Sequence, residues 1–151
     1  MLALTEIEGN VLNAPNDVFI VHCISADFKL GAGVAAQIDK KFNTRNQLLE
    51  LFPNGVRDIF NQKQGMCIQT PRVLNLVTKE LYFYKPNYHT MSNAIQALYT
   101  HCIDNQITNL AMPRIGCGLD GLRWELVKDI IKEVFTDGHP YKFIITVYNM
   151  S

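Results

Sequence analysis

Two glycine-rich turns, residues 29–35 and 113–122, are the segments of this sequence best suited to chemistry. Each follows a short apolar run that predicts a strand, and each precedes a stretch that predicts a helix. Glycine lets backbone N–H groups approach a ligand without an intervening Cβ atom. A helix N-terminus adds unpaired N–H donors and the positive end of a dipole. Two such turns facing each other predict a clamp for a diphosphate, and hence a nucleotide-type ligand held by the backbone.

The two turns differ in how strongly they indicate a ligand. The first contains Gly31 and Gly33 but lacks the third glycine of a dinucleotide-binding fingerprint. Taken alone, it is also compatible with a plain connection from strand to helix. The second turn has Gly116, Gly118 and Gly121 within six residues, whereas a plain connection needs one glycine. The second turn is therefore the stronger indicator.

Lys79 and Asp120 are the candidate reactive side chains near these turns. Lys79 follows a predicted strand and is either a solvated surface residue or an amine that attacks a sugar carbonyl carbon. Asp120 lies inside the second turn, where it either caps local backbone N–H groups or acts as a general base. It could take a proton from Lys79 or hold it in a salt bridge. The residues alone leave these alternatives open.

Length and composition set limits on the class of protein. A chain of 151 residues with 48% hydrophobic and 19% charged residues predicts one folded domain over 1–151. Its formal net charge of zero disfavours duplex nucleic-acid binding, which normally requires a basic excess. No apolar run reaches the roughly 20 residues that span a bilayer, and the start does not resemble a signal peptide. We therefore expect a cytoplasmic protein with no membrane partner. A monomer is taken as the default state.

The cysteine pattern gives no support for a metal site. Because no two cysteines form a CxxC motif, we expect free thiols and no bound metal. Two of them lie beside the proposed site, where small buried apolar side chains are expected rather than nucleophiles. His22, in a predicted buried strand, is expected to be a hydrogen-bonded core residue. The four cysteines are Cys23, Cys67, Cys102 and Cys117.

Several aromatic side chains are candidates to stack on a purine. Residues 82–84 are consecutive aromatics, so they cannot all face a core, and part of this segment is expected to be exposed in a loop. The candidates are Phe28, Tyr82, Phe83, Tyr84 and Tyr88.

The alternation of strands and helices predicts an α/β layered sheet. Ligands of such sheets bind at the carboxyl ends of the strands, where both glycine turns are expected. The last predicted helix has its apolar face at Leu126, Val127, Ile130, Ile131 and Val134. Strands are predicted at 5–9, 18–24, 65–69, 73–78, 110–112 and 143–148, and helices at 34–42, 46–52, 88–105 and 124–135.

Four segments of the chain resemble the macro-domain superfamily, and more narrowly its terminal ADP-ribose protein glutamate hydrolase branch. The order and spacing of these segments agree over nearly the whole chain. The resemblance implies a three-layer α/β/α macro domain with a central mixed, mostly parallel sheet. The segments are 8–12, 22–27 together with 31–35, 76–79, and 112–120.

The same resemblance implies roles for individual residues. Lys79 would attack the anomeric carbon of the distal ribose with assistance from Asp120, and no metal or other cofactor is implied. Asn10 and Val11 would lie near the adenine. Ser25 and residues 31–34 would line the phosphates and distal ribose, opposite a clamp at 115–119. The complete ligand-binding set is Asn10, Val11, Leu12, Ser25, Gly31, Ala32, Gly33, Val34, Pro113, Arg114, Ile115, Gly116, Cys117, Gly118 and Leu119.

The function that the resemblance implies is hydrolysis of the ester between ADP-ribose and a glutamate or aspartate side chain. Small O-acyl-ADP-ribose esters are further substrates, and the expected partners are ADP-ribose and ADP-ribosylated proteins. The alternatives are an ADP-ribose-1''-phosphatase and a non-catalytic ADP-ribose reader.

Two departures from the superfamily pattern bear on this function. Asn10 stands where many macro domains have an aspartate, so its bond to the adenine amine would carry no charge. Residues 22–25 replace the Asn-rich segment of the commoner hydrolases, which argues against their water-activating mechanism.

Overall fold

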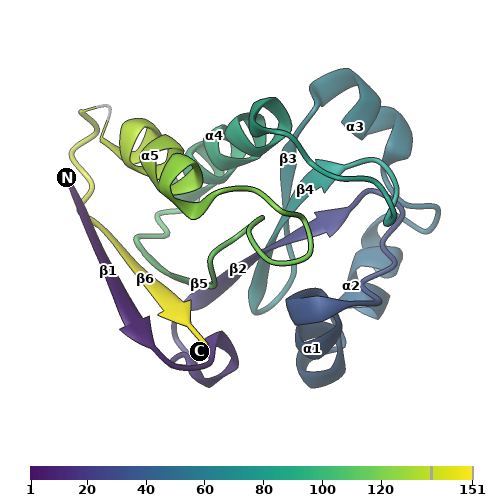
Figure 1. The fold of residues 1–151 in the computed structure, drawn as a ribbon, viewed down its shortest axis with the longest axis horizontal. Coiled ribbons are helices and arrows are strands. Elements are labelled where there is room, and N and C mark those ends of the chain that lie inside the picture. The colour runs from purple at the N-terminus through teal and green to yellow at the C-terminus, as the bar shows by residue number, and fades with distance from the viewer. Residues whose placement is uncertain (137, 151) are drawn as a thin grey trace.

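Six strands form one sheet in the computed structural model, which describes residues 1–136 and 138–150. The order across the sheet is β1-β6-β5-β2-β4-β3 (Figure 1). All neighbouring strands run parallel except β3, which is antiparallel to β4. The strands are β1 (Leu2–Glu8), β2 (Phe19–Ser25), β3 (Met66–Gln69), β4 (Val73–Lys79), β5 (Asn109–Met112) and β6 (Phe143–Asn149).

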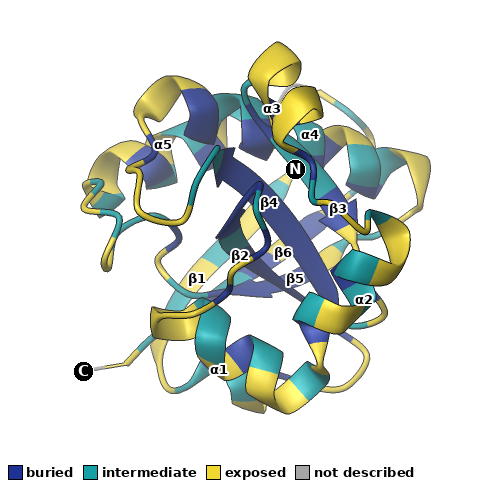
Figure 2. Ribbon diagram, turned by 90° about the vertical axis from the view of Figure 1, so that its right-hand side faces the viewer, coloured by how far each residue is buried: buried dark blue, intermediate teal, exposed yellow. Residues whose placement is uncertain are grey.

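Helices cover both faces of this sheet. Helices α4 (Tyr88–Asp104) and α5 (Trp124–Phe135) lie on one face, and α1 (Gly33–Phe42) and α2 (Thr44–Leu51) lie on the other (Figures 1 and 2). Helix α3 (Arg57–Lys63) packs through Phe60 near β3 and β4, and a short 3₁₀ helix, η1, spans Val11–Asn13. The predicted three-layer α/β/α fold with a mixed, mostly parallel sheet is confirmed.

The core is divided by the sheet because successive strand side chains point to opposite faces. Val21 of β2 and Leu76 of β4 pack in the cluster under α4 and α5. Ile20 of β2 and Val73 of β4 point to the opposite face of the sheet and pack against Ile38 of α1. Strands buried on both faces carry apolar residues at successive positions, and β2 and β4 do so up to their last residues, except at His22 and Asn75, which hydrogen-bond to each other.

The sequence predicted most elements to within a few residues, and the 124–135 helix without error. It missed α3, because this helix buries one apolar residue, Phe60, and lies just after Pro53 and Gly55. It also misplaced Leu126, which is 40% exposed, whereas the buried stripe of α5 is Val127, Ile131 and Phe135.

Across the described residues, none of the helices combines the length and the apolar character needed to cross a membrane.

Two substitutions in α5 test this assignment of its buried face. Ile131→Ala should lower the free energy of unfolding by about 2–4 kcal/mol, because the side chain is fully buried under the sheet and leaves a cavity. Leu126→Ala, on the same helix, should cost less than about 1 kcal/mol because Leu126 is partly solvated. Urea denaturation measures both values. Equal losses would contradict the observed orientation of α5.

Candidate active site at the carboxyl edge of the sheet

A cavity of about 990 Å³ lies at the carboxyl edge of the sheet, where the chain leaves β2 and β5 in opposite directions. The segment after β2 leads to α1 on one face, and the segment after β5 leads to α5 on the other (Figure 1). Because the two connections diverge, a crevice opens between neighbouring parallel strands. The cavity is at the upper end of the size range for small-molecule sites.

The loop between β2 and α1 holds the first glycine turn in a strained conformation. Phe28 and Leu30 have left-handed backbones, with φ of 57° and 46°. Bulky residues rarely adopt this region, so the surrounding structure must hold them there. Both side chains are buried, and Arg45 Nε donates to the Phe28 carbonyl at 2.8 Å. The apolar core therefore fixes the path of the turn.

Asp27 connects this loop to the segment that follows β4. Its Oδ1 accepts from Ser25 Oγ at 2.5 Å and from Lys29 N at 3.3 Å. Its Oδ2 accepts from the backbone N–H of Tyr82 at 3.0 Å. One carboxylate thus joins the ends of two neighbouring strands at the cavity wall.

Both glycine turns offer unpaired backbone donors. Ala32, at the N-terminus of α1, has no side-chain oxygen to cap the helix. Within the described residues, the N–H groups of 33–35 and of 118–120 donate to no protein acceptor. These residues line the cavity. Unpaired N–H groups on two sides of a cavity form a binding site for an anion such as a diphosphate.

The second turn depends on Gly116, whose φ is 73°. A Cβ atom at this position would lie 2.5 Å from Met91 Cε. The Leu122 N–H donates to the Gly116 carbonyl at 2.8 Å and closes the turn. Leu119 of the same turn meets the first turn, since a Cβ on Gly33 would lie 3.3 Å from Leu119 Cδ1.

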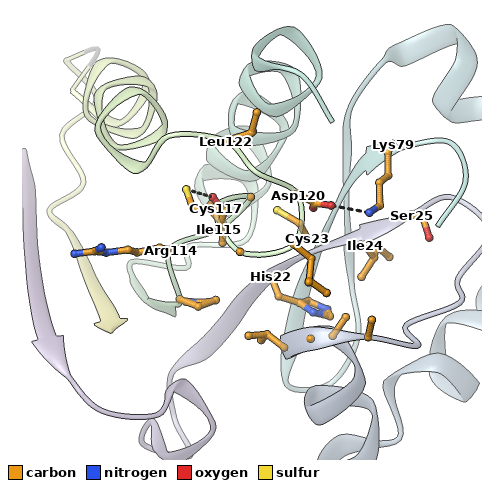
Figure 3. A pocket seen from close by; sticks show the side chains of 18 of the residues that line it. His22, Cys23, Ile24, Ser25, Lys79, Arg114, Ile115, Cys117, Asp120 and Leu122 are labelled. Atoms are coloured by element: carbon orange, nitrogen blue, oxygen red, sulfur yellow. Dashed lines mark hydrogen bonds and ion pairs between the residues drawn. The ribbon is translucent and has the colours of Figure 1, made fainter. Parts of the chain in front are cut away.

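Lys79 and Asp120 form an ion pair inside the cavity, with Nζ 2.7 Å from Oδ1 (Figure 3). Their side chains are only 15% and 17% exposed, which weakens solvent screening. A register shift between β2 and β4 pairs Ser25 with Lys79, after Ile24 has paired with Val77. Such a bulge re-aims the side chains that follow it. The strand irregularity therefore places Lys79 at the cavity.

The cysteines and the histidine of β2 are poor candidates for reactive groups. Burial raises the pKa of Cys117 to about 11 and the pKa of Cys23 well above its ordinary value. Thiols in this state are protonated at neutral pH and weakly nucleophilic. Burial also lowers the pKa of His22 to about 4, and its Nε2 pairs with Asn75 Oδ1 at 2.6 Å. The neutral ring belongs to the buried core.

The structure brings most of the predicted site residues to one cavity. The exception is the 10–12 segment, which does not line it. Asn10 Oδ1 accepts from the Leu12 N–H at 3.0 Å, and Val11 is buried. An adenine contact for these three residues stays a prediction. The predicted residues that line the cavity are Ser25, Gly31–Val34, Lys79 and Pro113–Asp120.

One of the candidate aromatic residues lies in the core, and other cavity residues were missed. Phe28 is fully buried in the core and cannot stack on a ligand, whereas 82–84 are exposed beside the cavity as expected. The missed residues are Trp124 and Glu125 at the start of α5 and 148–150 at the end of β6. The rule that located the glycine turns applies equally to β6, because its carboxyl end lies at the same edge.

Within residues 1–136 and 138–150, no three His, Cys, Asp or Glu side chains are grouped so that they could hold a metal ion.

The fold is similar to those of solved macrodomains. The macrodomain of Thermus aquaticus DarG aligns with a TM-score of 0.75 at 22% identity, covering 98% of this chain and 99% of that one. The macrodomain of Mycobacterium tuberculosis DarG gives 0.76 at 18% identity, covering 99% of each chain. Together with the cavity between two glycine turns, these likenesses define the fold as that of a macro domain. No family model matches the chain.

Sequence relatives define the branch. The ADP-ribose glycohydrolase OARD1 of Bos taurus is 38% identical over 97% of this chain and 91% of its own length. The Homo sapiens protein of the same name is 37% identical, again over 97% of this chain and 91% of its own length. The chain therefore belongs to the macro-domain superfamily, in its branch of terminal ADP-ribose hydrolases.

Two glycine substitutions test the packing of the second turn. Gly116→Ala should lower the free energy of unfolding by about 1–3 kcal/mol, because the new Cβ meets Met91 and the backbone is left-handed. Gly118→Ala should change it by less than about 0.5 kcal/mol, since no atom lies within 4 Å of its Cβ position. Chemical denaturation of both variants provides the measurement. A neutral Gly116→Ala would show that the turn is not held as described.

Proposed function

We propose that this protein removes ADP-ribose from glutamate and aspartate side chains by hydrolysing the ester bond, with Lys79 as nucleophile and Asp120 as its base. The observation that carries this proposal is the 2.7 Å contact between Lys79 Nζ and Asp120 Oδ1 in a cavity bordered by two glycine turns. The relatives named ADP-ribose glycohydrolase, about 38% identical, support the same class of reaction.

The cavity suggests one orientation for ADP-ribose. The unpaired N–H groups of 33–35 and 118–120 suit the diphosphate. With the diphosphate there, the distal ribose lies beside Lys79 and Asp120, close to the end of β4. The adenosine then extends in the other direction, toward the carboxyl end of β6, where 148–150 line the cavity.

The first chemical step needs a neutral amine. Asp120 Oδ1 takes a proton from Lys79 Nζ across their hydrogen bond, and the freed electron pair attacks the anomeric carbon of the distal ribose. The N–C bond forms as the bond from that carbon to the ester oxygen breaks. The leaving electron pair stays with the glutamate or aspartate, which departs as a carboxylate.

Hydrolysis completes the cycle. The lysine adduct opens to a Schiff base, and water adds to its carbon. The N–C bond then breaks, Lys79 recovers its proton and free ADP-ribose leaves. The carboxylate is a good leaving group, so small O-acyl-ADP-ribose esters fit the same chemistry. ADP-ribosylated proteins as partners and a monomeric state belong to this proposal.

Removal of Lys79 tests the proposal. Lys79→Ala should lower kcat on a glutamate-ADP-ribosylated protein by about a thousandfold or more, because it removes the amine that is paired with Asp120. The dissociation constant for ADP-ribose should stay within a few-fold, since the glycine turns are untouched. Release of ADP-ribose measured by chromatography gives kcat, and calorimetry gives the dissociation constant.

Lys40→Ala, an exposed lysine of α1 outside the cavity, is the matched control and should keep full activity. Full activity of folded Lys79→Ala would reject the lysine mechanism. Release of phosphate from ADP-ribose-1''-phosphate, independent of Lys79 and without protein deacylation, would instead identify a phosphatase. Binding of ADP-ribose without protein deacylation and without phosphate release would identify a non-catalytic reader.

A further inference from the structure

The carboxylate of Glu6, away from Lys79 and Asp120, contacts four side chains. Glu6, on β1, accepts at Oε1 from Trp124 Nε1 at 3.0 Å and from Asn149 Nδ2 at 3.4 Å. Its Oε2 accepts from Lys128 Nζ at 2.7 Å. Arg114 Nη2 lies 3.5 Å from Oε1 and completes the group.

Three of these four partners line the cavity, and each comes from a different segment. Arg114 belongs to the second glycine turn, Trp124 begins α5, and Asn149 ends β6. Lys128 lies one turn further along α5 and does not line the cavity. Glu6 itself does not line the cavity either. It therefore reaches the site only through other side chains.

The group is charged and partly shielded from water. The Glu6 side chain is 24% exposed. The hydrogen bond from Lys128 lowers the pKa of Glu6 to about 2, with further contributions from Asn149 and Trp124 and against the opposing effect of burial. At neutral pH Glu6 is a carboxylate, which only accepts hydrogen bonds.

The Glu6 carboxylate fixes the orientation of the Asn149 amide, because a carboxylate can only accept hydrogen bonds. Its N–H₂ group must face Glu6, so its carbonyl oxygen faces elsewhere. In the described part of the chain this buried oxygen, Asn149 Oδ1, has no hydrogen-bond partner. An unpaired buried acceptor costs about 1–3 kcal/mol. The contact with Glu6 therefore holds the Asn149 side chain in one orientation at the edge of the cavity.

The Glu6 group lies far from the reacting pair. Lys79 ends β4, and the strand order places β2 and β5 between β4 and β6. Three strand spacings correspond to roughly 14 Å. Figure 3 shows Arg114 at the opposite end of the site from Lys79. This end is the one to which the proposed orientation assigns the adenosine.

We propose that Glu6 is a positioning residue for the nucleoside end of the ligand, holding Arg114, Trp124 and Asn149 in the conformation that binds it. The proposal rests on the proposed function for the identity of the ligand. Without Glu6 these side chains lose their shared anchor and sample other rotamers. Ordering them then opposes binding, so affinity falls while the chemistry at Lys79 is unchanged.

The test compares Glu6→Gln with Lys128→Met. Glu6→Gln keeps the size of the side chain but removes the charge that Arg114 and Lys128 face. Lys128→Met removes one Glu6 partner and leaves the three cavity residues attached. Calorimetry measures ADP-ribose binding, and steady-state kinetics separate kcat from KM. The single tryptophan, Trp124, reports on its own mobility through acrylamide quenching of fluorescence.

Glu6→Gln should raise the dissociation constant and KM about tenfold, leave kcat within about twofold and increase quenching of Trp124. Lys128→Met should leave binding and KM within about twofold even where it lowers thermal stability. Unchanged binding in Glu6→Gln, or equal losses in both variants, would overturn the positioning role. Failure of the wild type to bind ADP-ribose would reject the proposed function instead, so the two failures are distinguishable.

Discussion

The parallel pairing of β2 with β5 on one side and β4 on the other determines where the site lies. It places three carboxyl ends together, and the diverging connections to α1 and α5 keep the edge above them open. The register shift at Ile24 and Ser25 then directs Lys79 to this opening, where Asp120 meets it. A slip of one residue in this pairing would turn the lysine away from the cavity.

The strands and turns that border the site could be predicted from the sequence, because each is marked by residues that are close together in the chain. An apolar run marked β2, and closely spaced glycines marked the turn at 113–122. The contact between Lys79 and Asp120 was not readable from periodicity, since it joins residues 41 positions apart through a strand bulge. Resemblance to a family supplied the pair, and the structure gives its geometry.

Other features lay beyond sequence reasoning for physical reasons. Phe28 was one of several candidates to stack on a purine, but it has a left-handed backbone and its side chain is fully buried in the core. Glu6 carried no signal, because an isolated acidic residue in an edge strand usually faces solvent. Its hydrogen bonds come from side chains more than 100 residues away, Trp124 and Asn149 among them. The contacts of Glu6 with Trp124 and Asn149 could therefore be found only in the folded structure.

The central claim, that Lys79 becomes covalently attached to the distal ribose, is open to direct measurement. Wild-type protein would be incubated with a glutamate-ADP-ribosylated substrate and a borohydride reductant, digested and examined by mass spectrometry. The expected result is a peptide in which Lys79 carries a reduced ADP-ribose adduct, and no such adduct in Asp120→Asn at matched times. Turnover with the adduct absent from Lys79, or present equally on exposed lysines such as Lys40, would contradict it.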